Sequence, residues 1–266
     1  MAAHDAAIEV EHLVAHYGSR KILDDVCFTA HQGEIMVIMG GSGSGKSTLL
    51  RHLLGLNHPT SGSIRLLGKD ITRLDADQMY DLRKNMGVAF QGGALFNSMT
   101  VGENVELPLR EHTRLDCNTI RIMSRMKLEV VNLSGFEDLM PAELSGGMIK
   151  RAALARAIVM DPRLLFFDEP SAGLDPVASA ELDELILMLR DAMNMTIVVV
   201  THELESAFKI ADRITVLDHG RILMSDRAEA VRQSDHPRIR SLLDRTPRSD
   251  TVDPEAYLQR LTREIS

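Results

Sequence analysis

Residues 40–47 form a glycine-rich run that ends in a lysine and a serine, a combination that can hold phosphate groups. Glycine lets the backbone wrap closely around an anion, so that successive N–H groups point inward. A helix starting at Ser47 would add the positive end of its dipole, and Lys46 would reach the β- and γ-phosphates. The pattern G-x-x-x-x-G-K-[ST] covers Gly40, Gly41, Ser42, Gly43, Ser44, Gly45, Lys46 and Ser47, with Thr48 next to it. The run predicts that the chain binds a nucleoside triphosphate.

A pair of carboxylates follows an apolar run near the middle of the chain. Asp168 ends the segment LLFFD, and Glu169 comes directly after it. Open α/β sheets bind ligands at the carboxyl ends of their strands, so we expect both side chains at the phosphate site. Asp168 would hold Mg²⁺ together with the Ser47 hydroxyl, and Glu169 would polarise an attacking water as general base. Without the phosphate-binding run, an ordinary acidic strand end would be the better interpretation.

Short apolar segments predict the elements that position these residues. We expect buried strands at 34–39, 86–90, 164–168 and 196–200, and a helix at 47–56. Wholly apolar strands that alternate with helices are typical of an α/β sheet covered on both faces. Alternating segments at 8–12 and 26–30, with a turn at 17–19 between them, predict part of a smaller antiparallel sheet.

The segment from residue 101 to about 160 is helical in its periodicity. We expect Gly102, Pro108, Gly135 and Pro141 to divide it into short helices, and further short helices at 227–244. The predicted organisation is an α/β core with its β-subdomain at 1–92 and 161–225, a helical subdomain at 93–160, and a C-terminal extension at 226–266.

The segment Leu144-Ser145-Gly146-Gly147 opens an apolar helix about twenty residues before the acidic pair. Ser145 is a favourable N-cap, and the glycines allow close approach to a phosphate. Alone, this would most simply be a helix cap. In this order and spacing it resembles the signature motif of ABC-transporter nucleotide-binding domains. Other positions match the same family, namely Tyr17 (adenine stacking), Gln91 (Q-loop), Asp175 (D-loop) and His202 (switch histidine).

The resemblance implies a P-loop ATPase fold with a RecA-like core, an antiparallel β-subdomain and an inserted helical subdomain. It also implies hydrolysis of ATP with Mg²⁺ between two head-to-tail copies, so that Ser145, Gly146 and Gly147 of one face the γ-phosphate held by Lys46 of the other. By this likeness the catalytic residues are Glu169, His202, Gln91 and Lys46. The metal ligands would be Ser47, Gln91 and Asp168.

Met148 stands where the common signature has glutamine, and this departure resembles the ATPases of MCE-protein lipid transporters. The segments 91–96, 108–113 and 139–143 also resemble the Mla phospholipid-transport system of Gram-negative bacteria. That likeness implies a transmembrane permease, a small STAS-domain subunit and a periplasmic MCE ring as partners, and a peripheral place on the cytoplasmic face of the inner membrane. An ATPase of a sugar, metal or amino-acid importer is the alternative. A soluble ABC ATPase of DNA repair or translation would carry coiled-coil insertions or a second ATPase domain.

The amino-acid composition further narrows the classes of protein to which the chain could belong. The 266 residues include 44% hydrophobic and 26% charged side chains, which is typical of a globular protein. The net charge of −8 argues against a nucleic-acid partner. Two distant cysteines, Cys27 and Cys117, fit a reducing compartment rather than a disulfide scaffold. We expect neither a signal peptide nor a membrane-spanning segment.

The end of the chain predicts one more helix. Asp253 and Pro254 suit its first positions, and Leu258, Leu261 and Ile265 form an apolar stripe. By the family likeness, this helix would reach a neighbouring ATPase subunit. The alternative is a frayed surface tail.

Overall fold

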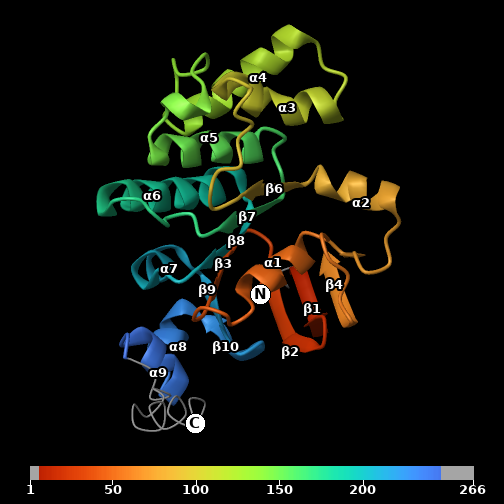
Figure 1. Cartoon of the computed structure of the whole chain (residues 1–266), viewed down its shortest axis with the longest axis vertical. Helices are drawn as coiled ribbons and strands as arrows, with labels where there is room; N and C mark the ends of the chain where they lie inside the picture. Colours follow the sequence, from red (N-terminus) through yellow and green to blue (C-terminus); the bar gives the residue numbers. More distant parts are fainter. Residues whose placement is uncertain (1–5, 247–266) are drawn as a thin grey trace, which may run out of the picture.

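The structure is a computed structural model, which describes residues 6–246. Its centre is a six-stranded sheet in the order β10–β9–β3–β8–β7–β6 (Figure 1). The strands are β3 (Ile35–Met39), β6 (Met86–Ala89), β7 (Leu164–Asp168), β8 (Thr196–Thr201), β9 (Arg213–Asp218) and β10 (Arg221–Arg227). Five of them pair in parallel, and β10 runs antiparallel to β9. The expected strands at 34–39, 86–90, 164–168 and 196–200 are confirmed to within a residue at either end.

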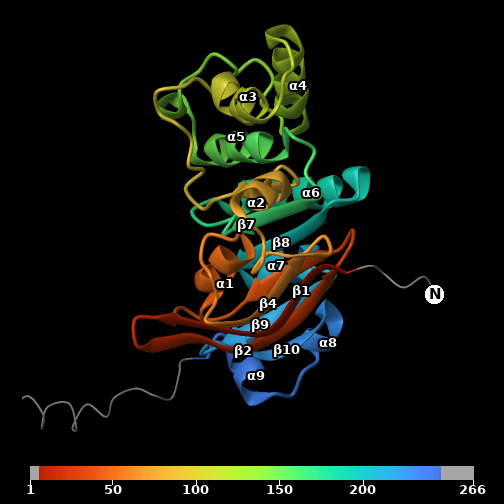
Figure 2. The same cartoon turned by 90° about the vertical axis from the view of Figure 1, so that its right-hand side faces the viewer.

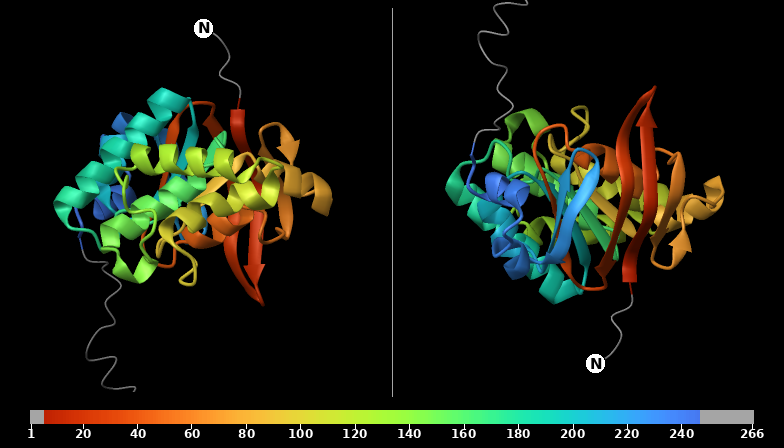
Figure 3. Two further views of the ribbon diagram at one scale, coloured as in Figure 1. Left: turned by 90° about the horizontal axis from the view of Figure 1, so that it is seen from above. Right: turned by 90° about the horizontal axis from the view of Figure 1, so that it is seen from below.

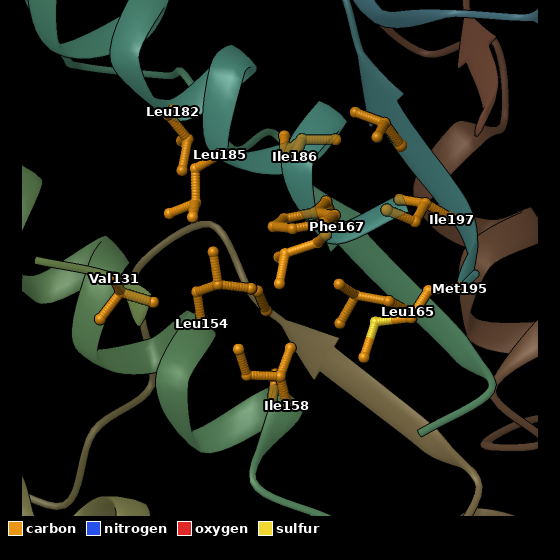
Figure 4. Close-up of a cluster of buried hydrophobic side chains, with 14 of the residues drawn as sticks. Val131, Leu154, Ile158, Leu165, Phe167, Leu182, Leu185, Ile186, Met195 and Ile197 are labelled. Carbon is orange, nitrogen blue, oxygen red and sulfur yellow. The ribbon is translucent and has the colours of Figure 1, made fainter. Parts of the chain in front are cut away.

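Both faces of the sheet are buried at its centre, which is why β3, β7 and β8 are apolar without alternation. In β7, Leu165 and Phe167 belong to one hydrophobic core, whereas Leu164 and Phe166 belong to a second. Figure 4 shows the first core, where β7 faces the helices α5 (Gly146–Ile158) and α6 (Pro176–Met193). The side chains that meet Leu165 and Phe167 there include Leu154, Ile158, Leu182, Leu185 and Ile186.

The second core lies between the large sheet and a four-stranded antiparallel sheet (Figure 2). This smaller sheet has the order β2–β1–β4–β5, with β1 (Ala6–Tyr17), β2 (Arg20–His31), β4 (Ser61–Leu66) and β5 (Lys69–Asp70). Helix α1 (Lys46–Leu53) contributes to the same core, and α2 (Ala76–Arg83) follows β5. The predicted antiparallel sheet is confirmed, with longer strands than the alternating segments indicated. Seen from below (Figure 3), β2 lies beside β10, where the Asp24 amide donates to the Gly220 carbonyl at 2.9 Å.

Between β6 and β7 the chain forms α3 (Val101–His112), α4 (Cys117–Val130), the 3₁₀ turn η1 (Pro141–Glu143) and α5. The prediction that Gly102 and Pro108 divide this region is wrong, because both lie inside α3. Gly102 sits in the first turn, where no helical acceptor exists for its amide, and it donates instead to the Glu137 carbonyl at 2.8 Å. Burial of Val105 and Leu109 on either side of Pro108 holds the helix through the proline.

After β8 come α7 (Leu204–Ile210), and, beyond β10, α8 (Ala228–Arg232) and α9 (Pro237–Leu243). The short helices expected at 227–244 are therefore present. The helix expected from Asp253 lies outside the described residues.

Candidate functional site

The phosphate-binding run forms the turn between β3 and α1. Gly45 has φ +108° and is the N-cap of α1, a conformation that a side chain would strain. Gly40 is packed so closely that a Cβ there would lie 2.1 Å from the Leu217 carbonyl oxygen. The two glycines therefore permit a tight loop that ends at the start of a helix.

Lys46 points back into this loop. Its Nζ donates to the carbonyl oxygens of Gly40 at 2.8 Å and Gly41 at 3.2 Å. Burial lowers the pKa of Lys46, and the nearby carboxylates of Glu169 and Asp168 oppose that shift. The buried Ser44 hydroxyl has no hydrogen-bond partner among the described residues. A polyanionic phosphate fits this loop because it would give the half-buried ammonium charged acceptors in place of neutral ones.

The acidic pair lies at the carboxyl end of β7. Burial raises the pKa of Asp168, the neighbouring Glu169 carboxylate raises it further, and Arg51 and Lys46 oppose the rise. Glu169 adopts a left-handed backbone with φ +49°, which costs about 1–3 kcal/mol for a residue with a side chain. Its Oε2 lies 2.9 Å from His202 Nδ1 and accepts from the Thr201 hydroxyl at 3.2 Å. The glutamate and the histidine thus form one hydrogen-bonded pair.

A cavity of about 950 Å³ gathers these groups. Its lining includes ten of the predicted residues, namely Gly40, Gly41, Ser42, Gly43, Lys46, Ser47, Gln91, Asp168, Glu169 and His202. Residues from the end of β9 and from α9, such as Asp218 and Arg238, line another side. No sequence pattern predicts that wall, because only the fold brings α9 to the cavity.

Other predicted residues lie outside this lining. Ser44, Gly45 and Thr48 belong to the loop and to α1 but do not line the cavity. Tyr17 ends β1 with 83% of its surface exposed. Asp175 caps α6 by accepting from the amides of Val177 and Ala178, both at 3.0 Å.

The signature segment also lies apart from the chain's own cavity. The Ser145 hydroxyl accepts from the Met148 amide at 3.3 Å and caps α5, while Gly146 is exposed. A Cβ on Gly147 would lie 3.9 Å from Leu174 Cδ2, so the start of α5 adjoins the segment before Asp175. Among residues 6–246, the cavity lining includes none of Ser145, Gly146 and Gly147.

Two basic residues of α5 were missed by the sequence analysis. Lys150 Nζ donates to the carbonyl oxygens of Glu169 at 3.2 Å and Pro170 at 2.5 Å. Arg156 donates to the carbonyl oxygens of Gly93 at 2.8 Å and Ala94 at 2.7 Å. Burial lowers the pKa of both side chains, with the Glu169 carboxylate opposing the shift at Lys150. Basic residues within an otherwise apolar helix were the available signal. They join α5 to the turn after β7 and to the loop after Gln91.

Asn104 is a third missed residue, and it is fully buried. Its side chain accepts from the Phe96 amide at 2.7 Å and donates to the carbonyls of Phe96, Met99 and Thr100 at 2.9–3.2 Å. The loop between Gln91 and α3 is therefore fixed by α3 from one side and by α5 from the other.

A family model described as ABC transporter matches residues 23–172, the stretch that holds the phosphate loop, the signature and the acidic pair. The chain belongs to the ABC transporter family. This ABC ATPase is 44% identical over 232 residues to the intermembrane phospholipid transport system ATP-binding protein MlaF of Haemophilus influenzae, covering 87% of this chain and 88% of the relative. It is 43% identical over 237 residues to a probable ribonucleotide transport ATP-binding protein, mkl, of Mycobacterium tuberculosis, covering 89% of this chain and 66% of the relative.

Solved structures support the same fold for this ABC ATPase. The ATP-binding cassette MJ0796, in a dimeric post-hydrolysis state with ADP and Pi, has a TM-score of 0.77 at 30% identity, covering 83% of this chain and 98% of that one. CbiO1 of Clostridium perfringens has a TM-score of 0.79 at 29% identity, covering 90% of this chain and 99% of that one. The chain therefore has the α/β ABC ATPase fold and hydrolyses ATP. In the part of the chain described here, no helix has the length and apolar character needed to cross a membrane.

Proposed function

We propose that this ABC ATPase powers phospholipid transport between the inner and outer membranes of a bacterium, from the cytoplasmic face of the inner membrane. The observation that carries the proposal is the 44% identity that extends over nearly the whole length of the phospholipid-transport relative. The ribonucleotide-transport relative is nearly as similar, but this chain spans a smaller share of it. Ribonucleotide transport is therefore the second candidate.

In this proposal the cavity holds ATP and Mg²⁺. Ser47, Gln91 and Asp168 line it together, and their oxygen atoms are ligands that Mg²⁺ prefers. When bound, the ion would neutralise charge on the β- and γ-phosphates. Lys46 would leave its loop carbonyls for the phosphate oxygens, and Glu169 would accept a proton from the attacking water. His202, already paired with Glu169, would hold that carboxylate and contact the γ-phosphate.

A second copy of the chain would complete the site. Ser145, Gly146 and Gly147 lie outside the cavity of their own chain, so they remain available to a nucleotide held elsewhere. The N-terminus of α5 offers amides and a positive dipole to a γ-phosphate. We propose the head-to-tail homodimer, with Tyr17 stacking on adenine and Asp175 near the shared interface.

The proposed membrane partners are a permease, a small STAS-domain subunit and an MCE ring joined through the permease. The loop fixed by Asn104 and Arg156 is the proposed dock for the permease. Phe96 is 52% exposed there, whereas Leu95 packs against the core and Met99 is half-buried. We therefore expect Phe96→Glu to release the permease or uncouple transport while leaving the ATP affinity of the isolated ATPase unchanged. Wild-type assembly and coupling in that variant would remove Phe96 from the dock.

The general-base assignment predicts the effect of Glu169→Gln. The amide keeps the shape of the side chain but cannot take a proton from water, so turnover should fall at least a hundredfold while ATP affinity stays within a few fold. Steady-state hydrolysis and nucleotide titration measure the two quantities. Lys46→Ala should instead weaken binding itself. Parental turnover in Glu169→Gln would show that Glu169 is not the base.

The transport assignment is tested by purifying the tagged chain from detergent-solubilised membranes of its own host. Co-purification of a permease with STAS and MCE subunits, and ATP-dependent lipid transfer by that complex between liposomes, would support it. A sugar-, metal- or amino-acid-importer permease, or nucleotide uptake without lipid transfer, would contradict it. Glu169→Gln is the matched control, because it should assemble equally well and transfer no lipid.

A further inference from the structure

Two successive bulges distort the β1–β2 hairpin around His12 and Asp25. The register passes from Val10–Phe28 to Leu13–Val26, so two residues of β1 lie opposite Cys27 alone. It then passes to Ala15–Leu23, so two residues of β2 lie opposite one of β1. His12 (φ +50°) and Asp25 (φ +59°) take left-handed conformations at these bulges. Bulges of this kind redirect side chains that would otherwise follow the alternation of a strand.

The bulges bring together three different metal-binding groups. His12 Nδ1 lies 2.7 Å from Asp25 Oδ1 and 3.8 Å from Cys27 Sγ, and all three atoms lie within 4.8 Å of one another. All three residues are exposed, so an ion can reach them from solvent. The neighbouring Asp24 is already engaged by Lys21 and Arg221, so it does not compete for the ion.

We propose that His12, Asp25 and Cys27 bind a divalent transition-metal ion of the zinc class, with water in the fourth position. Nitrogen, oxygen and sulfur bonds of about 2.0–2.3 Å in a tetrahedron separate ligand atoms by roughly 3.3–3.7 Å. The separations in the hairpin lie on both sides of this range, so rotation of exposed side chains suffices to reach it. This mixed set does not suit Mg²⁺ or Ca²⁺, which take oxygen ligands.

A backbone hydrogen bond also holds the Cys27 sulfur next to His12. The His12 amide donates to Cys27 Sγ at 3.1 Å. On binding, the Cys27 thiol releases its proton to solvent, and the proton on His12 Nδ1 moves through water to Nε2, so that Nδ1 can bind the ion. The Asp25 carboxylate then exchanges its hydrogen bond with His12 for a bond to the ion. The ion would then connect β1 to β2 across both bulges.

The test uses the full-length chain after chelator treatment, titrated with Zn²⁺ by calorimetry and with Co²⁺ by absorption. We expect one ion per chain at this site, a Co²⁺–thiolate charge-transfer band, and an increase in Tm with Zn²⁺. His12→Ala, Asp25→Asn and Cys27→Ser should each weaken binding at least tenfold, and Cys27→Ser should abolish the band. Cys117→Ser is the matched control, because Cys117 is also exposed but lies outside the cluster.

Three results would overturn the proposal. One is wild-type protein that gives no thiolate band with Co²⁺. Another is a band lost in Cys117→Ser but kept in Cys27→Ser. The third is Zn²⁺ affinity that changes less than threefold in all three site variants. Because the three side chains are exposed, the metal-free variants should fold, and their Tm without metal verifies this.

Discussion

Asp168 illustrates a conflict between stability and binding at a single residue. Its carboxylate is half-buried at the end of β7, and burial together with Glu169 raises its pKa. A raised carboxyl pKa means that the folded state holds the proton more tightly than the unfolded state. Stability therefore falls as the pH rises from 3.8 through the raised value, and the full penalty is present above that value. The charged form of Asp168 therefore lowers the stability of the nucleotide-free protein.

We predict that Asp168→Asn increases the Tm of the nucleotide-free protein at pH 7 by about 2 °C or more, because it removes that penalty. The same change should abolish most of the additional stabilisation by ATP and Mg²⁺, which needs the charge. Thermal unfolding with and without nucleotide measures both effects. Asp138→Asn, at an exposed position, serves as the control. A lower Tm in nucleotide-free Asp168→Asn would contradict the prediction.

At the scale of elements, α5 connects the parts of the site that must act together. Its first turn carries the signature, Lys150 in the second turn holds the carbonyls of Glu169 and Pro170, and Arg156 holds the loop after Gln91. Glu169 is strained at φ +49°, so its side chain keeps its direction only while such contacts fix the backbone. A shift of α5 would therefore reorient the proposed base.

Lys150 is accordingly a positioning residue, and Lys150→Met should lower kcat about tenfold with the KM for ATP within twofold. Lys150→Arg, which keeps the charge and the donors, should restore part of the rate. Steady-state kinetics measure both values. Arg151→Met is the matched control from the same helix turn, because Arg151 pairs with the Val131 carbonyl and Glu181 outside the site. An equal fall of kcat in that control would reduce the role of Lys150 to general stability.

At the scale of the whole molecule, the cavity and the signature segment, which together form the proposed catalytic site, lie apart within one chain. The cavity holds Lys46 and Glu169, whereas Ser145 lies outside it. In the proposed arrangement, one chain therefore holds the nucleotide in its cavity, and a second copy supplies the signature that faces the γ-phosphate.

We predict that Glu169→Gln forms a stable dimer with ATP and Mg²⁺, because the nucleotide that joins the copies is not consumed. Adding Ser145→Arg should keep nucleotide binding but prevent dimer formation, since the larger cation would block the approach of α5. Light scattering after gel filtration gives the mass of each species. A dimer of the double variant, or a monomer of Glu169→Gln with saturating nucleotide, would disprove the head-to-tail arrangement.

Patterns that depend on neighbours in the chain were readable from the sequence. Residues 164–168 were identified as a buried strand because burial on both faces requires an unbroken apolar run, and the loop at 40–47 because its glycines and Lys46 are consecutive. The order of the motifs was enough to indicate the ABC ATPase fold. Gly102 and Pro108 misled the prediction, because tertiary contacts outweighed their local tendency to end a helix.

The sequence alone thus determined the class of fold, and it predicted the phosphate loop and the acidic pair as the site. Only the tertiary structure decided that Lys150 holds Glu169, that Arg156 and Asn104 fix the loop after Gln91, and that α9 lines the cavity. It also decided that Tyr17 and Ser145 lie outside that cavity. The reason is physical: a backbone carbonyl accepts from any donor that reaches it, so the basic residues of α5 indicate that donors are present but not that Arg156 bonds to Gly93. Such partners exist only once packing of the two cores has fixed the distances between elements.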